Sequence, residues 1–160
     1  MTVHRRNPPS QKALPFPDWP RTDREAWTAA QETAGVLYDG GVTSHLKAYT
    51  RWDLTRRYAY FLSFLSHRER LDSQGGAAAS VTEQNILDYV HYLEPRVSSV
   101  TLAQSLRKIA RVATFLDPGR DWRWLRRLVR RLQLRARPRD RRNDVVEIRD
   151  LFRLGLQLDA

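Results

Sequence analysis

The stretch of sequence that decides the fold runs over residues 99–136 and reads SVTLAQSLRKIARVATFLDPGRDWRWLRRLVRRLQLRA. Over 99–116 its apolar residues recur every three or four positions, which is the period of one helix face. They are Leu102, Leu106, Ile109, Ala113 and Leu116. The tripeptide Asp-Pro-Gly at 117–119 ends this helix, and Asp121 is a typical N-cap residue for a second one over 121–136. The stretch therefore predicts two helices joined by a tight turn.

The second of these helices has two chemically different faces. At 100° per residue, its apolar residues gather on one face and its arginines on the opposite one, apart from Leu134, which falls among the arginines. The apolar residues are Leu125, Leu128, Val129 and Leu132. Residues 120–142 hold eleven arginines and two aspartates, so they carry +9 of the chain's net charge of +10. Such a one-sided stretch favours a phosphate-binding face over a merely solvated one.

Proline and glycine divide the rest of the chain into further helical segments. We expect helices over 21–34, 44–67, 82–94 and 144–158. The last of these is apolar nearly all round, so it either packs back on the other helices or, as we favour, opens a second domain. The sequence has no run of alternating apolar and polar residues that would predict a strand. The predicted fold class is therefore all-α, a small bundle of four to five helices.

Polar residues at the predicted helix starts are of the types that cap helices. The helix over 21–34 is expected to be capped by Thr22 or Asp23. Ser80 and Glu83 have the spacing of a capping box, for which Thr82 competes as the N-cap. The helix over 99–116 is expected to be capped by Ser98 or Ser99.

Composition excludes several classes of protein. The 160 residues include no cysteine, so disulfides, thiolate metal sites and a cysteine nucleophile are excluded, and a reducing, cytoplasmic location is expected. No apolar run reaches 18 residues, which predicts no membrane span. The four histidines show no metal-ligand spacing, and no hydrolase or nucleotide-binding motif occurs, so we expect no metal, cofactor, small-molecule substrate or catalytic site.

Two other helices carry cations away from their apolar stripes, and the linker after Pro138 extends the positive charge. Small polar side chains near the start of the helix over 99–116 could reach base edges, although an ordinary amphipathic surface is the alternative there. The candidate DNA-binding residues are Lys47, Arg51, Thr101, Gln104, Arg107, Lys108, Arg111, Arg123, Arg127, Arg130, Arg131, Arg137 and Arg139.

Aromatic residues crowd the helix over 44–67 and flank the start of the arginine-rich helix. For the first group we expect core packing rather than base stacking, and for Trp122 and Trp124 we expect that they anchor the arginine-rich helix. The first group is Trp52, Tyr58, Tyr60, Phe61 and Phe64.

Short motifs follow one another in an order that resembles a known family. They are DWP at 18–20, DRxxW at 23–27, YxxW at 49–52, FLSFL at 61–65, VT at 81–82 before YV at 89–90, VTL at 100–102 and LDPGRDWxWL at 116–125. In order and spacing they are similar to the N-terminal core-binding (SAM-like) domain of tyrosine recombinases, the phage-type site-specific integrases. The resemblance covers residues 18–137 and extends weakly into 154–156.

The resemblance implies a helical domain that clamps duplex DNA at a recombination half-site. It matches the helices that begin at Ser44 and Ser99 to the family's groove-facing helices, and 137–143 to its linker. It divides the chain into an N-terminal arm with a short helix (1–40), a DNA-binding domain (41–137), and a basic linker with the first helix of a truncated catalytic domain (138–160). The family's catalytic residues lie in that later domain, so we expect no catalysis from this chain.

The expected function is therefore that of the DNA-binding module of a site-specific recombinase. Its expected partners are duplex DNA and, by the resemblance, other recombinase protomers. The residues leave two alternatives open, an RNA-binding module and a protein-interaction module, each using the basic helix over 121–136.

Overall fold

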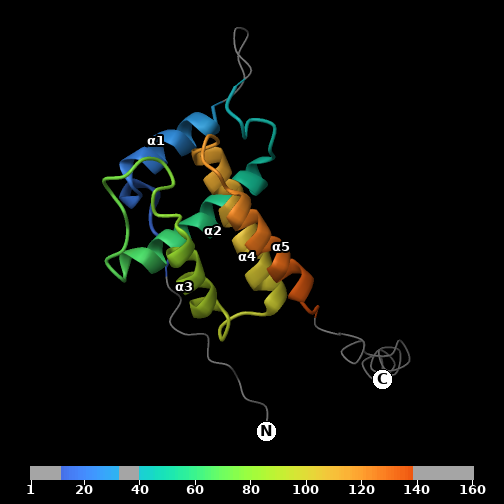
Figure 1. Cartoon of the computed structure of the whole chain (residues 1–160). Coiled ribbons are helices and arrows are strands. Elements are labelled where there is room, and N and C mark those ends of the chain that lie inside the picture. The colour runs from blue at the N-terminus through green and yellow to red at the C-terminus, as the bar shows by residue number, and fades with distance from the viewer. Residues whose placement is uncertain (1–11, 33–39, 139–160) are drawn as a thin grey trace, which may run out of the picture.

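A computed structural model of the chain describes residues 12–32 and 40–138. Within these ranges it contains helices and no strand, so the predicted all-α bundle is confirmed (Figure 1). The predicted helix over 144–158 lies outside the described residues. The elements are η1 (Phe16–Asp18), α1 (Arg21–Ala30), α2 (Ala48–Ser66), α3 (Glu83–Leu93), α4 (Ser99–Leu116) and α5 (Arg123–Arg135).

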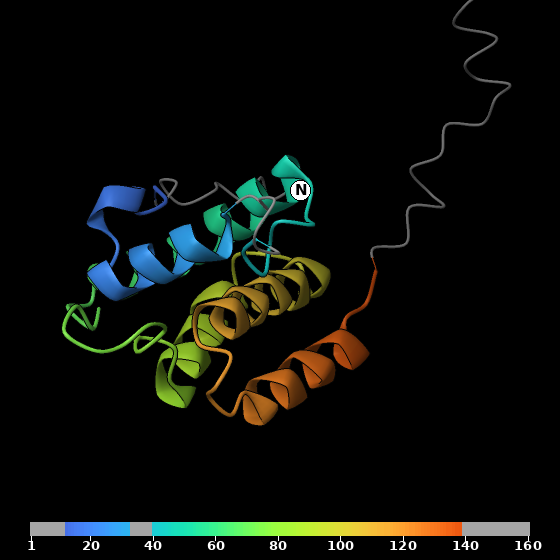
Figure 2. The same cartoon turned by 90° about the horizontal axis from the view of Figure 1, so that it is seen from above.

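Helix α4 is the centre of the bundle. Figure 2 shows α1 and α2 on one side of it and α5 on the other. Its apolar stripe, including Leu106 and Ile109, is fully buried, and its small residues Ala103 and Ala110 are buried as well. Small side chains allow a neighbouring helix to approach closely. Because other helices cover α4 on two sides, only a narrow strip of it is open to solvent.

The segment before α1 packs on the bundle. The Leu14 N–H donates to the Ala59 carbonyl of α2 at 3.1 Å, and the Trp19 indole N–H donates to the Leu14 carbonyl at 3.1 Å. Trp19 and Trp27 belong to the same buried core as α2 and α4. Residues 13–19, which the resemblance assigns to an N-terminal arm, are therefore held on the bundle by these hydrogen bonds and by the buried Trp19 ring.

The predicted caps of α1 are wrong, because Pro20 occupies the N-cap position and both expected caps are used in tertiary contacts. The buried Asp23 carboxylate accepts from the Tyr58 hydroxyl and from the Ala78 N–H, each at 2.7 Å. Thr22 donates to the Gly75 carbonyl at 3.0 Å. These bonds hold residues 72–80, part of the connector between α2 and α3, against α1.

The start of α2 differs from the prediction. The helix begins at Ala48, not at 44, because Thr43 is held elsewhere: its N–H and its hydroxyl both donate to the Ala30 carbonyl, at 2.8 and 2.6 Å. Residues 42–46 consequently form turns.

The caps of the two following helices are confirmed in part. Thr82 and Ser98 are the N-caps, and their hydroxyls accept from the backbone N–H groups three residues on. Ser80, the alternative cap of α3, instead accepts from the Asp72 N–H at 3.0 Å. The Ser80 side chain, which the local spacing assigns to the start of α3, therefore forms its hydrogen bond within the connector.

The aromatic group of α2 divides between core and surface. Tyr58, Phe61 and Phe64 are buried as predicted. The core prediction is wrong for Trp52, which is 51% exposed, and Tyr60 is only half-buried. Both lie on the outer side of the helix, because they are one or two residues out of phase with the apolar stripe through Leu54.

Candidate nucleic-acid interface

Two tryptophans fix helix α5 on the bundle. Trp122 is buried and donates its indole N–H to the Asp117 carbonyl at 2.7 Å, which confirms its predicted anchoring role. The ring of Trp124 is half-buried 6.4 Å from that of Trp122. Behind them Leu125 and Val129 are buried, whereas Leu134 is 77% exposed. The apolar face of α5 is therefore turned to α4, and its arginines are turned to solvent.

An ion pair closes the first turn of α5. Trp122 holds the N-cap position in place of the predicted Asp121, but the Asp121 carboxylate still accepts from the Arg123 N–H at 2.9 Å. The same carboxylate binds the Arg123 guanidinium at 2.8 Å, and this contact lowers the pKa of Asp121 to about 2. Arg123 is thus already paired, unlike the later arginines of α5.

The outer face of α5 consists of unpaired arginines. Within 12–32 and 40–138, no carboxylate lies within ion-pair distance of any of them. Residues four apart on a helix are separated by about 6 Å along its axis. Like charges at that spacing repel one another, so the face gains from an anion that binds it. These exposed arginines are Arg126, Arg127, Arg130, Arg131 and Arg135.

Arg120 belongs to the basic stretch in sequence but not to this face. Its guanidinium donates to the carbonyls of Ala78 and Val81 at 3.1 and 3.0 Å, and it lies 4.5 Å from the centre of the Trp122 ring. It joins the connector over 72–80 to the start of α5. The charge available for a ligand is therefore smaller than the sequence count indicates.

The candidate residues of α4 occupy its open strip. Arg107 and Arg111 are exposed, and Thr101 and Gln104 are half-buried one and two turns away. Lys108 is paired with Asp53 of α2 at 2.5 Å. The strip therefore offers two unpaired guanidinium groups next to the arginine face of α5.

The end of α5 returns to the start of α4. The Arg137 N–H donates to the Ser99 hydroxyl at 3.0 Å. This bond places Arg137 at the same end of the bundle as Thr101, while Arg139 lies outside the described residues. No pattern in the sequence indicates such a contact between residues 38 apart.

Two candidates are not brought to this surface. Lys47 and Arg51 lie at the start of α2, and α4 separates α2 from α5 (Figures 1 and 2). A ligand on the arginine face of α5 is therefore not in reach of every predicted residue.

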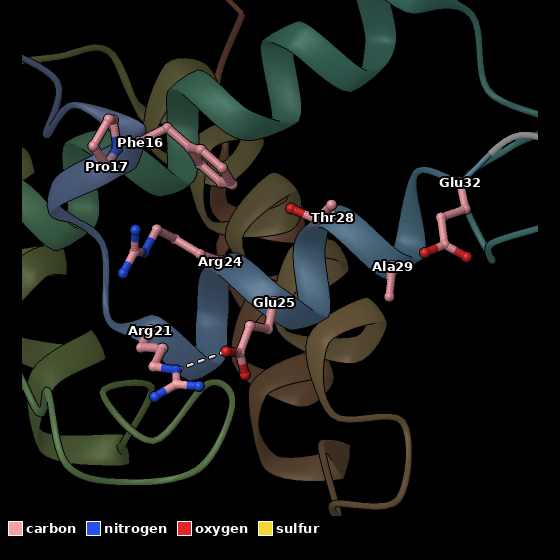
Figure 3. A pocket seen from close by; sticks show the side chains of 8 residues that line it. All are labelled: Phe16, Pro17, Arg21, Arg24, Glu25, Thr28, Ala29 and Glu32. Atoms are coloured by element: carbon pink, nitrogen blue, oxygen red, sulfur yellow. Dashed lines mark hydrogen bonds and ion pairs between the residues drawn. The ribbon is translucent and has the colours of Figure 1, made fainter.

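Two shallow hollows lie on the surface. One, of about 410 Å³, runs between α3 and α5, and apolar side chains and the charged side chains of Glu83, Arg127 and Arg131 line it together. The other lies along the outside of α1, where Arg21 pairs with Glu25 and the buried Nε of Arg24 has no hydrogen-bond partner (Figure 3). Neither has the enclosed shape of a small-molecule site.

Among the described residues, no group of three or more histidine and acidic side chains is placed to hold a metal ion. No helix in those same ranges is long and apolar enough to cross a membrane. In comparisons with known proteins, no family model, no curated protein and no solved structure matches this chain. The resemblance to integrases thus remains a prediction from sequence motifs.

Proposed function

We propose that this protein binds duplex DNA through the arginine face of α5, as the DNA-binding module of an integrase-type recombinase. The observation that carries the proposal is the set of exposed arginines on α5 with which no carboxylate of the described residues forms an ion pair. Duplex DNA carries one negative charge per about 1.7 Å of axis, so it supplies the density of anions that such a face needs.

The way α5 is held supports binding by a preformed surface. Its buried anchors fix the helix on α4, so the guanidinium groups need little ordering of the backbone when a ligand binds. Arg107 and Arg111 widen the basic surface onto α4. Contacts of this kind go mainly to phosphates and confer little sequence preference, and they bind rather than cleave.

The proposal is tested by fluorescence anisotropy of a labelled 30-base-pair duplex of random sequence, titrated with the protein at several salt concentrations (the length spans about three helical turns). We expect a steep log–log dependence of affinity on salt. The variant Arg127→Ala with Arg130→Ala should reduce the slope by up to about two units, at about 0.9 per lost phosphate contact.

A charge-matched control separates a local effect from a general loss of charge. Lys12→Ala with Arg21→Ala also removes two cations, both exposed and both at the N-terminal side of the bundle. This control should leave the slope nearly unchanged. Equal slopes for the two double variants would refute the role of α5. Preference for structured RNA over the duplex would instead support the alternative RNA-binding function.

A further inference from the structure

An aromatic surface on α2 has no role in the interface described above. It consists of Tyr49, Trp52, Arg56 and Tyr60, which we call the α2 shelf. Tyr49 is 73% exposed and Trp52 is 51% exposed. Exposed aromatic side chains that lie together, rather than singly, are typical of an interaction surface, and these are not part of the core.

The shelf is ordered by contacts between its own members. The ring centres of Tyr49 and Trp52 are 5.6 Å apart. The Arg56 guanidinium lies 5.2 Å from the Trp52 ring and 5.6 Å from the Tyr60 ring, and it donates to the Tyr60 hydroxyl at 3.1 Å. The Arg56 guanidinium is therefore held by the Trp52 and Tyr60 rings, Tyr49 packs on Trp52, and Tyr49 and Trp52 stay exposed.

The charge around the shelf is positive. The neighbouring carboxylate of Asp53 is engaged by Lys108 at 2.5 Å and by Arg57 at 3.8 Å. Arg56 is paired with no carboxylate of the described residues. The shelf thus combines flat apolar rings with uncompensated positive charge, which matches a ligand that is both aromatic and anionic.

We propose that the α2 shelf binds unpaired bases of single-stranded nucleic acid. Bases stack on aromatic side chains with little sequence preference, and nearby arginines neutralise the backbone phosphates. Bases inside a duplex are stacked on one another and do not offer their faces, so the shelf selects single strands, whereas the arginine face of α5 accepts a duplex. The inference goes beyond the proposed duplex binding and does not depend on it.

The position of the shelf supports a strand that also contacts the duplex surface. The Asp53–Lys108 ion pair joins the shelf side of α2 to the open strip of α4, where Arg111 is exposed one turn further along. A strand leaving a frayed or nicked duplex on α5 would therefore cross the α4 strip before it reaches the shelf.

The test uses the full chain and a labelled dT oligomer of about 12 nucleotides, followed by anisotropy. Trp52→Ala should weaken binding about 5- to 150-fold, as expected for the loss of one stacked base. Trp52→Phe, which keeps a ring, should restore most of the affinity. Leu87→Ala on α3 is the matched control, because it shortens another exposed apolar side chain away from the shelf.

A second readout places the oligomer on the shelf. Trp52 is the most exposed of the five tryptophans, so its emission should be quenched by stacked thymine and protected from acrylamide when the oligomer binds. Unchanged oligomer affinity in Trp52→Ala, or a Trp52 that stays fully accessible to acrylamide, would overturn the proposal. So would sedimentation that reveals a dimer lost in Trp52→Ala, since a second copy would then cover the shelf.

The two proposals can fail separately. Arg127→Ala with Arg130→Ala should weaken the duplex strongly and the oligomer much less, and Trp52→Ala should do the reverse. If the protein binds the oligomer through Trp52 but no duplex, the shelf stands and the proposed function is wrong.

Discussion

Replacing Asp23 by alanine should destabilise the protein strongly, although the residue is far from the arginine face. Asp23 is buried, and its two oxygens are the acceptors for the Tyr58 hydroxyl and the Ala78 N–H, which are buried too. A buried donor left without an acceptor costs about 1–3 kcal/mol, so two of them cost about 2–6 kcal/mol. Removing a buried charge offsets part of this, and we expect a net loss of about 2–4 kcal/mol.

The conservative variant should behave differently. In Asp23→Asn the amide oxygen can accept from the Ala78 N–H and the amide nitrogen can donate to the Tyr58 oxygen, so both contacts remain possible. Its loss of stability should be about 1–3 kcal/mol, smaller than that of Asp23→Ala, because only the Tyr58 hydroxyl proton is left without an acceptor. Asp23→Asn is therefore the control that separates loss of the hydrogen bonds from loss of the charge.

The carboxylate also makes stability depend on pH. Burial raises the pKa of Asp23 above its ordinary value of 3.8, and the bonds from Tyr58 and Ala78 oppose that shift only in part. Between pH 3.8 and the raised pKa, the folded protein holds a proton that the unfolded chain has released. The contribution of Asp23 to the free energy of unfolding should therefore fall as pH rises through this window, and Asp23→Asn should remove that dependence.

Urea unfolding followed by circular dichroism measures these differences. Tyr58→Phe removes one of the two donors, so Asp23→Ala should cost about 1–3 kcal/mol less in that background than in the wild type. A loss below about 1 kcal/mol for Asp23→Ala would refute the reasoning. Full additivity with Tyr58→Phe would show that the hydroxyl does not depend on the carboxylate.

Two further substitutions test the start of α5 and the loop before α2. Asp121→Asn should free the Arg123 guanidinium for a ligand, while the amide oxygen of the new side chain still accepts from the Arg123 N–H. The salt slope of duplex binding should therefore steepen by about 0.9, and a shallower slope would contradict this. Gly41→Ala should destabilise the protein by about 1–3 kcal/mol in urea unfolding, because an added Cβ would lie 2.3 Å from the Ala29 carbonyl oxygen. Gly76→Ala is the control, since a Cβ there meets nothing within 4 Å. Equal stability of the two variants would contradict the prediction.

Much of the fold can be predicted from local sequence. The apolar period over 99–116 and the Asp-Pro-Gly turn place α4 at the predicted bounds. The division of α5 into an apolar and an arginine face also follows directly from helical geometry, because α5 has one buried side. Where a helix has a regular stripe and a clear stop, its position follows from periodicity.

The candidate site is predicted less completely. Periodicity places Arg127, Arg130 and Arg131 on the open face of α5, where the structure has them. It cannot show that Arg120 binds two carbonyls of a distant connector, or that Asp53 of another helix takes Lys108. Such pairings join residues 39 to 55 positions apart and leave no local pattern.

The sequence by itself determined the helices, their apolar faces and the concentration of positive charge, because each depends on neighbours within one or two turns. Only the tertiary structure decided which polar groups serve the core and which remain for a ligand. Asp23 accepts hydrogen bonds in a buried network instead of capping α1, and Trp52 lies outside the core. The physical reason is that the burial and hydrogen bonding of a side chain depend on which segment packs beside it, and these contacts form between helices rather than within one helix.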